Sequence, residues 1–201
     1  MRPRRTIFQE IEMLKLSENP PVLTPSASKI TDLAGKWWVA HTRARCEKAF
    51  AWDLLHHGIG YFLPLVERLT ISGGKRRHVL MPLFPSYVFF CGSDADRYRA
   101  MTTNRLCQTL DVFDQSSLIE DLAAIEKALS NKAELDLYPF AVQGKRCRIR
   151  GGPFEGIEGV VVHRKAVARL VLEVSILGQG ASLEIDADLL EPIDQMGVVS
   201  G

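Results

Sequence analysis

The sequence predicts an α+β protein: a mixed sheet with packed helices, followed by a small five-stranded β-barrel. Two observations carry this prediction. Between residues 35 and 133, segments with the apolar period of strands alternate with segments that have the period of amphipathic helices. Between residues 142 and 194 only the strand period remains. Five short strands within about fifty residues fit a small closed barrel, which leaves no exposed sheet edge.

Composition and charge narrow the class of protein. The chain has 201 residues, 46% of them apolar and 24% charged, which is the ordinary balance of a globular protein of one or two domains. Its formal net charge is +1, so any nucleic-acid contact must come from a local patch. No stretch approaches the roughly 20 apolar residues of a membrane span, and no apolar signal segment follows the N-terminal arginines. We therefore expect a cytoplasmic protein that contacts no membrane.

Motifs for catalysis or cofactor binding are missing from the sequence. The four cysteines form no CxxC pair and have no histidine cluster nearby, which argues against a zinc site and a disulfide framework. A phosphate-binding glycine loop, a GxSxG motif and an HExxH motif are also absent. We expect no enzymatic activity, no cofactor and no metal.

Residues 1–34 are expected to be a flexible extension, because the segment contains prolines and few large apolar side chains after Leu16. It is either a frayed tail or the site of one partner-binding helix. Thr6 and Gln9 have the spacing of a capping box for this helix, and Ile7, Ile11 and Leu14 would form its apolar face.

The expected N-terminal domain spans residues 35–133. Its strands are expected at 36–42, 61–71, 76–80, 86–91 and 110–113. A Ser-Gly-Gly-Lys turn over residues 72–75 joins the second and third strands and indicates a hairpin. The run 86–91 is apolar almost throughout, as in a central strand that is covered on both faces.

Three helices are expected in the same domain, over 44–57, 93–103 and 117–129. The first is followed by Gly58, at the position where left-handed backbone ends a helix. Capping boxes begin the other two, formed by Ser93 with Asp96 and by Ser117 with Glu120. The third helix carries an apolar stripe made by Leu118, Leu122, Ile125 and Leu129.

Residues 134–141 are expected to be a linker, residues 142–194 the barrel and residues 195–201 a tail. Alternation predicts barrel strands over 145–150, 157–163, 170–176 and 181–185, with glycine turns after the first and third. The β-branched residues within these runs favour a stable barrel over a helical hairpin.

Four segments resemble the NusG family of transcription factors. Residues 152–161, Gly-Pro-Phe-Glu-Gly-Ile-Glu-Gly-Val-Val, resemble the KOW motif, and residues 175–185 resemble the last hairpin of an SH3-like KOW barrel. Residues 37–42, Trp-Trp-Val-Ala-His-Thr, are similar to the first strand of the NusG N-terminal domain, with Glu47 in the next helix. Residues 83–88 resemble its signature segment, where many members have Gly or Asn in place of Ser86.

The resemblance covers residues 36–194 and implies a function that is mechanical rather than chemical. It implies a transcription elongation factor that binds the clamp helices of RNA polymerase, suppresses pausing and modulates termination as an antitermination factor at selected operons. The polymerase-binding residues that it implies are Trp38, His41, Phe84, Pro85 and Tyr87. Trp38 and Tyr87 are either core or contact residues, whereas Phe84, between two prolines, is expected to be an exposed anchor.

The resemblance also implies contacts with nucleic acid. Contact with the non-template DNA strand is implied for Arg43, His56, His57, Asn104 and Arg105. The histidines, Arg43 and Arg105 are otherwise explained as cations near a helix end. The hairpin tip, with Lys75, Arg76 and Arg77, either contacts upstream DNA or polymerase, or only aids solubility.

The KOW domain is expected to bind Rho or a small-subunit ribosomal protein through Ile176, Leu177, Gly178 and Gln179. Housekeeping members usually have Phe at position 177 and Arg at 179, and these departures favour a specialised, monomeric paralogue of the RfaH, LoaP and UpxY kind. The alternative is a ribosome-associated RNA-binding KOW protein. Seven Lys and Arg against eight Asp and Glu between residues 142 and 194 argue against it.

Overall fold

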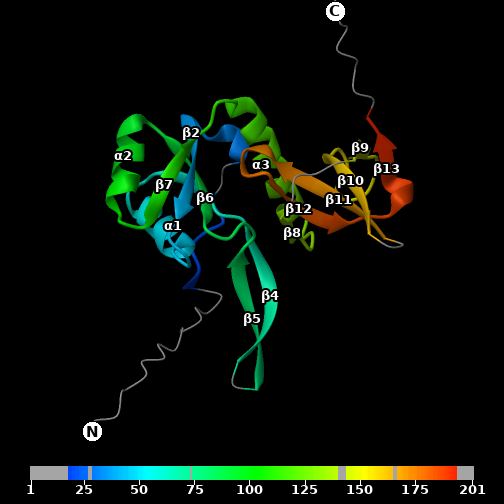
Figure 1. Cartoon of the computed structure of the whole chain (residues 1–201), viewed down its shortest axis with the longest axis horizontal. Coiled ribbons are helices and arrows are strands. Elements are labelled where there is room, and N and C mark those ends of the chain that lie inside the picture. The colour runs from blue at the N-terminus through cyan, green and yellow to red at the C-terminus, as the bar shows by residue number, and fades with distance from the viewer. Residues whose placement is uncertain (1–17, 27–28, 73, 140–143, 165–166, 194–201) are drawn as a thin grey trace, which may run out of the picture.

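The structure is a computed structural model that describes residues 18–26, 29–72, 74–139, 144–164 and 167–193. Its strands form three antiparallel sheets, of five, six and two strands (Figure 1). The five-stranded sheet has the order β1-β3-β6-β2-β7. Its strands are β1 (Leu23–Thr24), β2 (Lys36–Thr42), β3 (Gly60–Phe62), β6 (Tyr87–Gly92) and β7 (Leu106–Asp111). The helices are α1 (Glu47–His56), α2 (Asp94–Thr102) and α3 (Gln115–Ser130), with a 3₁₀ turn η2 (Ile30–Asp32).

Strands β2 and β6 pair at the middle of the five-stranded sheet, and side-chain alternation buries both of their faces. Trp37 and Val39 pack in one apolar cluster with α3, whereas Trp38 and Ala40 pack in a second cluster with α1 and α2. The expected strand 36–42 and the expected central strand at 86–91 are confirmed, the latter shifted by one residue. The strand expected at 110–113 is instead β7, which ends at Asp111.

All three expected helices form, with different starting residues. Helix α1 begins three residues later than expected and is followed by Gly58 at φ +67°, the left-handed geometry that was expected. The Ser93–Asp96 capping box of α2 is confirmed. The expected Ser117 cap of α3 is wrong: Asp114 is the N-cap and accepts a hydrogen bond from the Ser117 N–H (2.9 Å).

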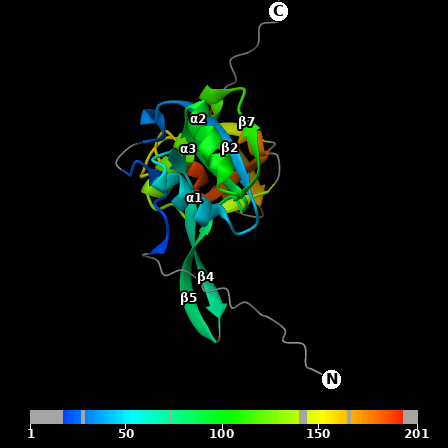
Figure 2. The same cartoon turned by 90° about the vertical axis from the view of Figure 1, so that its left-hand side faces the viewer.

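A two-stranded ribbon projects from the rest of the molecule (Figures 1 and 2). It consists of β4 (Leu65–Ser72) and β5 (Lys75–Pro82), and the expected hairpin is confirmed. The single strand expected over 61–71 is divided into β3 and β4, because Pro64 has no N–H for a sheet ladder. The Pro64 carbonyl instead accepts a hydrogen bond from the Leu83 N–H (2.8 Å).

Described residues of the expected extension, within 18–26 and 29–34, are built into the fold, which corrects the expectation for that part of it. Strand β1 pairs with β3, and Ile30 in η2 is completely buried. The Ile30 N–H donates to Glu126 Oε2 on α3 (3.0 Å). The apolar side chains of Leu23 and Ile30 explain the packing, since burying each removes apolar surface from water. The helix expected between residues 6 and 14 lies outside the described residues.

The second half of the chain forms a sheet with the order β13-β9-β10-β11-β12-β8. Its strands are β8 (Asp136–Tyr138), β9 (Lys145–Ile149), β10 (Glu158–Arg164), β11 (Val167–Val174), β12 (Gln179–Glu184) and β13 (Leu190–Pro192). Turns η3 (Ser175–Leu177) and η4 (Ala187–Leu189) lie between them. The sheet has six strands rather than five, because the expected linker contributes β8, which follows the buried Leu135 and pairs with β12. Closure of this sheet into a barrel stays a prediction.

Helix α3 lies between the two larger sheets (Figure 1). One apolar cluster runs through it, from Phe89 of the first sheet through Leu122 and Ile125 to Leu172 and Val174 of the second. The core is therefore continuous across the expected domain boundary, and the division into two domains stays a prediction. Among the described residues, no helix is long and apolar enough to cross a membrane.

Candidate functional site

Two of the five expected polymerase-binding residues lie in the core. Trp38 has no exposed surface and stacks on Phe90, with 5.5 Å between ring centroids. Phe84 is only 1% exposed and meets Phe89 edge-on at 6.1 Å. The prediction that Phe84 is an exposed anchor is therefore wrong. The Leu83 N–H donates to the Pro64 carbonyl, and the Tyr87 N–H donates to the Phe84 carbonyl (3.2 Å). These bonds hold a tight turn, and the Phe84 side chain packs inside the protein.

The other three residues form an accessible surface at the end of β2 and β6. His41 and Tyr87 are cross-strand neighbours whose rings stack at 5.1 Å with an interplanar angle of 23°. Both are half-buried, and Pro85 beside them is exposed. A stacked aromatic pair next to an exposed proline offers a partner a firm apolar surface that loses little side-chain entropy on binding. We call His41, Pro85 and Tyr87 the aromatic corner.

A buried carboxylate holds the turn that presents the aromatic corner. Ser86 has a left-handed backbone (φ +67°), which is unfavourable for residues other than Gly and Asn. Its N–H donates to Glu47 Oε1 at 2.6 Å, and its carbonyl accepts from the Thr42 N–H at 2.8 Å. Glu47 is only 6% exposed. The backbone conformation explains why Gly or Asn suits this position of the signature segment, and the hydrogen bond gives Glu47 a positioning role.

The five residues expected to contact the non-template strand come from three elements that meet at the surface. The Arg43 N–H donates to the Arg105 carbonyl (2.8 Å), which joins the end of β2 to the turn before β7. Arg105 also pairs with Asp53 of α1 (Nε–Oδ2, 3.1 Å). Asn104 sits in this turn with φ +58°. The structure thus gathers Arg43, Asn104 and Arg105, with their side chains exposed.

His56 and His57 lie at the C-terminal end of α1, where both side chains are exposed. Sequence reasoning missed Trp52, which is half-buried and stacks on His56 (6.2 Å between centroids, 26°). Unlike Trp37 and Trp38, it belongs to neither apolar cluster. Trp52 stands four residues before His56, and this spacing on an expected helix indicates that the two side chains are neighbours. Figure 2 shows α1 and α2 on the same side of the molecule.

The third expected basic group lies at the far end of the ribbon. Arg76, Arg77 and His78 are exposed, and the His78 ring pairs with Glu67 across the ribbon (Nδ1–Oε1, 2.8 Å). The side chain of Lys75 lies outside the described part of the structure. The ribbon therefore presents its basic residues away from the aromatic corner's sheet (Figure 1).

The residues expected to bind a partner of the second domain lie against α3. Ile176 and Leu177 are half-buried and pack on the continuous core. The preceding Ser175 N–H donates to Asp121 Oδ2 on α3 (3.0 Å). Gly178 is exposed in left-handed geometry (φ +58°), and Gln179 begins β12. Part of the surface of this loop is therefore covered by α3, which belongs to the first half of the chain.

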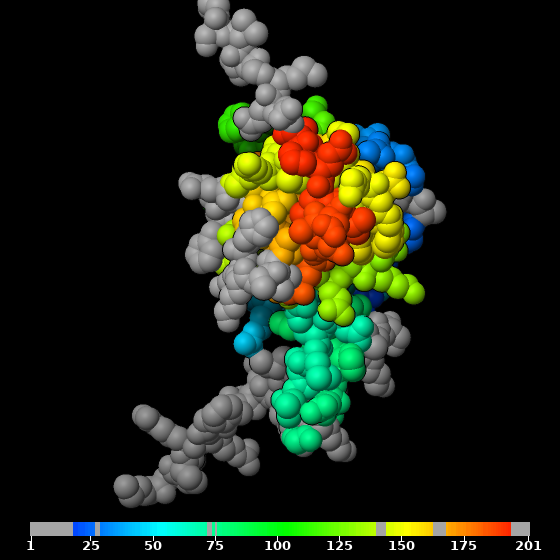
Figure 3. Space-filling view, turned by 90° about the vertical axis from the view of Figure 1, so that its right-hand side faces the viewer, coloured from blue at the N-terminus to red at the C-terminus, as the bar shows by residue number. Residues whose placement is uncertain are grey.

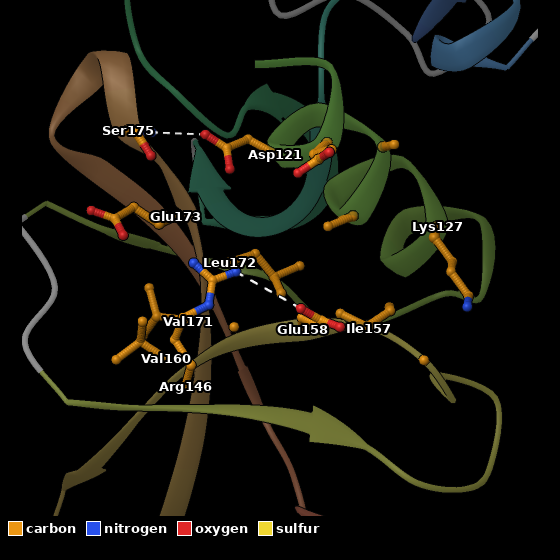
Figure 4. Close-up of a pocket in the computed structure, with 15 residues that line it drawn as sticks. Asp121, Lys127, Arg146, Ile157, Glu158, Val160, Val171, Leu172, Glu173 and Ser175 are labelled. Carbon is orange, nitrogen blue, oxygen red and sulfur yellow. Dashed lines mark hydrogen bonds and ion pairs between the residues drawn. The ribbon is translucent and has the colours of Figure 1, made fainter. Parts of the chain in front are cut away.

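A cleft of about 520 Å³ separates α3 from β10 and β11 next to this loop (Figure 4). Its ionisable lining groups are Glu120, Asp121, Lys127, Arg146, Glu158 and Glu173. Burial raises the pKa of Asp121, although its bond from Ser175 and the charge of Arg146 act in the opposite direction. Lys127 donates to the Glu155 carbonyl and so ties α3 to the second sheet. Within the described residues, no cluster of His, Cys, Asp or Glu could hold a metal ion.

Comparison with known proteins gives one family match. Residues 35–117 match the family model described as NusG, transcription termination factor nusG. A solved structure described as "Domain interaction in Thermotoga maritima NusG" is similar, with 18% sequence identity and a TM-score of 0.43. It covers 79% of this chain and 97% of its own. No curated protein matches the chain. The family match alone makes residues 35–117 NusG-like, and this segment includes the aromatic corner, Glu47 and the ribbon.

Proposed function

We propose that this protein is a non-enzymatic transcription factor that binds the clamp helices of RNA polymerase, suppresses pausing and modulates termination. The NusG match of residues 35–117 supports a role in transcription elongation and termination. The observation that carries the polymerase contact is the stacked, accessible pair His41–Tyr87 beside Pro85, on a turn fixed by Glu47. Trp38 and Phe84 support this surface from the core and do not contact the partner.

The mechanism is a shift of a conformational equilibrium. A protein that binds the elongating state of polymerase more tightly than the paused state favours the former by its difference in binding free energy. This requires a rigid surface. The aromatic corner has one, because its two strands pair at the middle of a sheet that is covered on both faces.

The displaced DNA strand is the second proposed contact. Arg43, Asn104 and Arg105 meet at one surface, where Arg105 pairs with Asp53 of α1. The same helix carries the Trp52–His56 stack and is followed by His57. Cationic side chains with an aromatic ring suit the phosphates and exposed bases of single-stranded DNA. The basic end of the ribbon, Lys75 to Arg77 in the sequence, adds a separate nucleic-acid contact.

The second sheet is the proposed site for Rho or a small-subunit ribosomal protein, through Ile176, Leu177, Gly178 and Gln179. The substitutions in this loop favour a specialised paralogue that prevents termination at selected operons. A ribosome-associated RNA-binding KOW protein is the alternative. The arginines of β9 do not favour it: Arg148 is paired with Glu158 (2.5 Å), which reduces the positive charge offered to RNA.

The test is binding of the full-length protein to a clamp-helix fragment of RNA polymerase. We expect Tyr87→Ala to weaken binding by about 2 kcal/mol, roughly thirtyfold, because it removes one aromatic anchor. Pro85→Glu should weaken it as well by placing an uncompensated charge in the contact, and circular dichroism checks that this variant, changed at an exposed residue, is folded. Tyr98→Ala is the matched control, since Tyr98 is an exposed tyrosine on α2.

Equal affinity of all four proteins would remove the aromatic corner from the proposal. If the folded wild-type protein does not bind the fragment while a housekeeping NusG does, the polymerase function itself is wrong. Ribosomal subunits, offered in the same assay, then decide whether the alternative holds.

A further inference from the structure

One face of the β4–β5 ribbon carries exposed apolar side chains. Ile71 is 72% exposed and Leu69 is 54% exposed. They stand two residues apart on β4, so both side chains lie on the same face, which we call the apolar row. In space-filling view the ribbon stands apart from the body (Figure 3). A two-stranded ribbon is only marginally stable in water by itself, so a second element is expected to cover this face.

The apolar row continues from the core of the first sheet. Leu65 and Leu80 lie on the same face nearer the base, because Leu65 alternates in step with Leu69 and the register places Leu80 opposite Glu67. Both leucines pack in the apolar cluster that contains α1. Lys48 of α1 donates to the Leu80 carbonyl (2.5 Å), which fixes the base of the ribbon. The row is therefore the outer end of one apolar surface that begins beside α1.

The described chain begins near the base of this same face. Strand β1 runs antiparallel to β3, and the Leu63 N–H donates to the Val22 carbonyl (2.7 Å). Followed toward the N-terminus, the chain therefore runs in the direction in which β3 leads into β4. Val22 also packs against the cluster of α1, and Figure 1 shows the start of the described chain on the same side of the ribbon as α1. Residues 1–17 thus join the fold near the base of the ribbon.

The sequence of residues 6–17 is complementary to this face. Ile7, Ile11 and Leu14 have helical spacing and form one apolar stripe. Between residues 6 and 18 the sequence has three glutamates and one lysine, whereas residues 68–79 of the ribbon contain no Asp or Glu. Arg76 is exposed on the face of the apolar row, opposite Ile71. Apolar surface and charge therefore both favour contact between the segment and the ribbon.

We propose that residues 6–17 form an amphipathic helix that packs along the apolar row of the ribbon. A helix of this length is about 18 Å long and an eight-residue strand about 26 Å, so the helix fits on the ribbon. A helix of about 12 residues is marginal in water, as a two-stranded ribbon is, and each supplies the apolar surface that the other lacks. Because both belong to one chain, the contact forms at a high effective concentration.

The contact gives the N-terminal segment a role that does not depend on the polymerase. It covers apolar side chains that otherwise favour association with other molecules. It also stiffens the outer part of the ribbon. The base is already tied to the second half of the chain, because Arg68 donates to the Leu135 carbonyl (2.7 Å) and pairs with Asp136 (2.8 Å).

Hydrogen–deuterium exchange of the full-length protein tests the proposal, read separately for residues 6–17 and for the ribbon. Ile71→Thr keeps a β-branched residue, so the strand is retained, but it removes apolar surface from the row. It should speed exchange of the amides of residues 6–17 about tenfold, because less apolar surface holds the helix in place. Met81→Thr is the matched control: Met81 is 46% exposed but lies on the other face, opposite Val66. It should leave this exchange unchanged.

The reciprocal variant changes the N-terminal segment. Ile11→Asp places a charge in the apolar stripe and should speed exchange of the ribbon amides about tenfold. Leu16→Asp is its control, because Leu16 lies on the opposite side of the same helix. It should leave the ribbon amides as they are in the wild-type protein.

Other results overturn the inference in distinguishable ways. If residues 6–17 of the wild-type protein exchange as fast as an unfolded peptide, no helix packs on the ribbon. If Ile71→Thr acts no differently from Met81→Thr, or Ile11→Asp no differently from Leu16→Asp, the contact does not use the apolar row. Protection of the ribbon that rises with protein concentration means that a second copy covers the row. Protection that appears only when the clamp-helix fragment or a DNA duplex is added assigns the row to that partner instead.

Discussion

Replacing Glu47 by alanine tests whether one buried carboxylate positions the proposed polymerase contact. Glu47 Oε1 accepts the Ser86 N–H at 2.6 Å, and the side chain is 6% exposed. The substitution leaves this N–H without its partner at a residue whose left-handed backbone is already unfavourable. Losing a partly buried, charge-assisted hydrogen bond costs about 2–3 kcal/mol of unfolding free energy. For a chain of this size, that lowers the melting temperature by roughly 4–12 °C.

The matched control is Glu126→Ala. Glu126 on α3 accepts the Ile30 N–H at 3.0 Å, so it makes the same kind of bond far from the aromatic corner. Both variants should lose stability in thermal unfolding followed by circular dichroism. Only Glu47→Ala should also weaken binding to the clamp-helix fragment, measured below the melting temperature of both variants. The reasoning is refuted if Glu47→Ala binds as well as Glu126→Ala, or if it unfolds at the wild-type temperature.

Three further changes have expected outcomes. Asp121→Asn should raise the free energy of unfolding at neutral pH: burial raises the pKa of Asp121, so the contribution of this carboxyl to stability is greatest in acid and is lost as pH rises through that pKa; thermal unfolding of both proteins over a series of pH values measures this. Cys91 should stay unmodified by a maleimide until the protein unfolds, because burial, with a smaller effect of the nearby Asp96 carboxylate, raises its pKa to about 11. The exposed Cys107 should react in the folded protein, and mass spectrometry of the labelled peptides distinguishes the two cysteines. Trp52→Ala should weaken binding to single-stranded DNA by about 1–3 kcal/mol, roughly fivefold to 150-fold, and leave binding to the clamp-helix fragment unchanged; anisotropy titrations compare the two.

The sequence predicts strands and helices well where one residue pattern decides them. Alternation along β2 and the capping box of α2 depend only on local spacing, and both are confirmed. The break between β3 and β4 depends on Pro64, whose missing N–H could have been given more weight. Strand β8 was missed because three residues between turns carry too little pattern; it exists through pairing with β12 more than forty residues later.

Exposure of the site residues was harder to predict than their location. Alternation tells which side chains share a face of a strand, but both faces of this sheet are covered. Phe84 moreover lies in the turn before β6, where alternation does not apply, so the sequence could not distinguish the buried Phe84 from the accessible Tyr87. Similarly, Trp52 was missed because only the packed structure shows that it lies outside both clusters.

Helix α3 lies between the proposed polymerase contact on the first sheet and the proposed partner-binding loop at residues 176–179. Its apolar residues pack on the first sheet and on the second, and Asp121 holds the Ser175 N–H at the start of the loop expected to bind a partner. Ile176 and Leu177 cannot give their buried surface to α3 and to a second protein at once. A partner of this loop therefore competes with α3, and its measured affinity is reduced by the free energy of that packing. Asp121→Ala removes the acceptor of the Ser175 N–H, so it should release the loop, strengthen partner binding there and leave the aromatic corner, on the first sheet, unaffected.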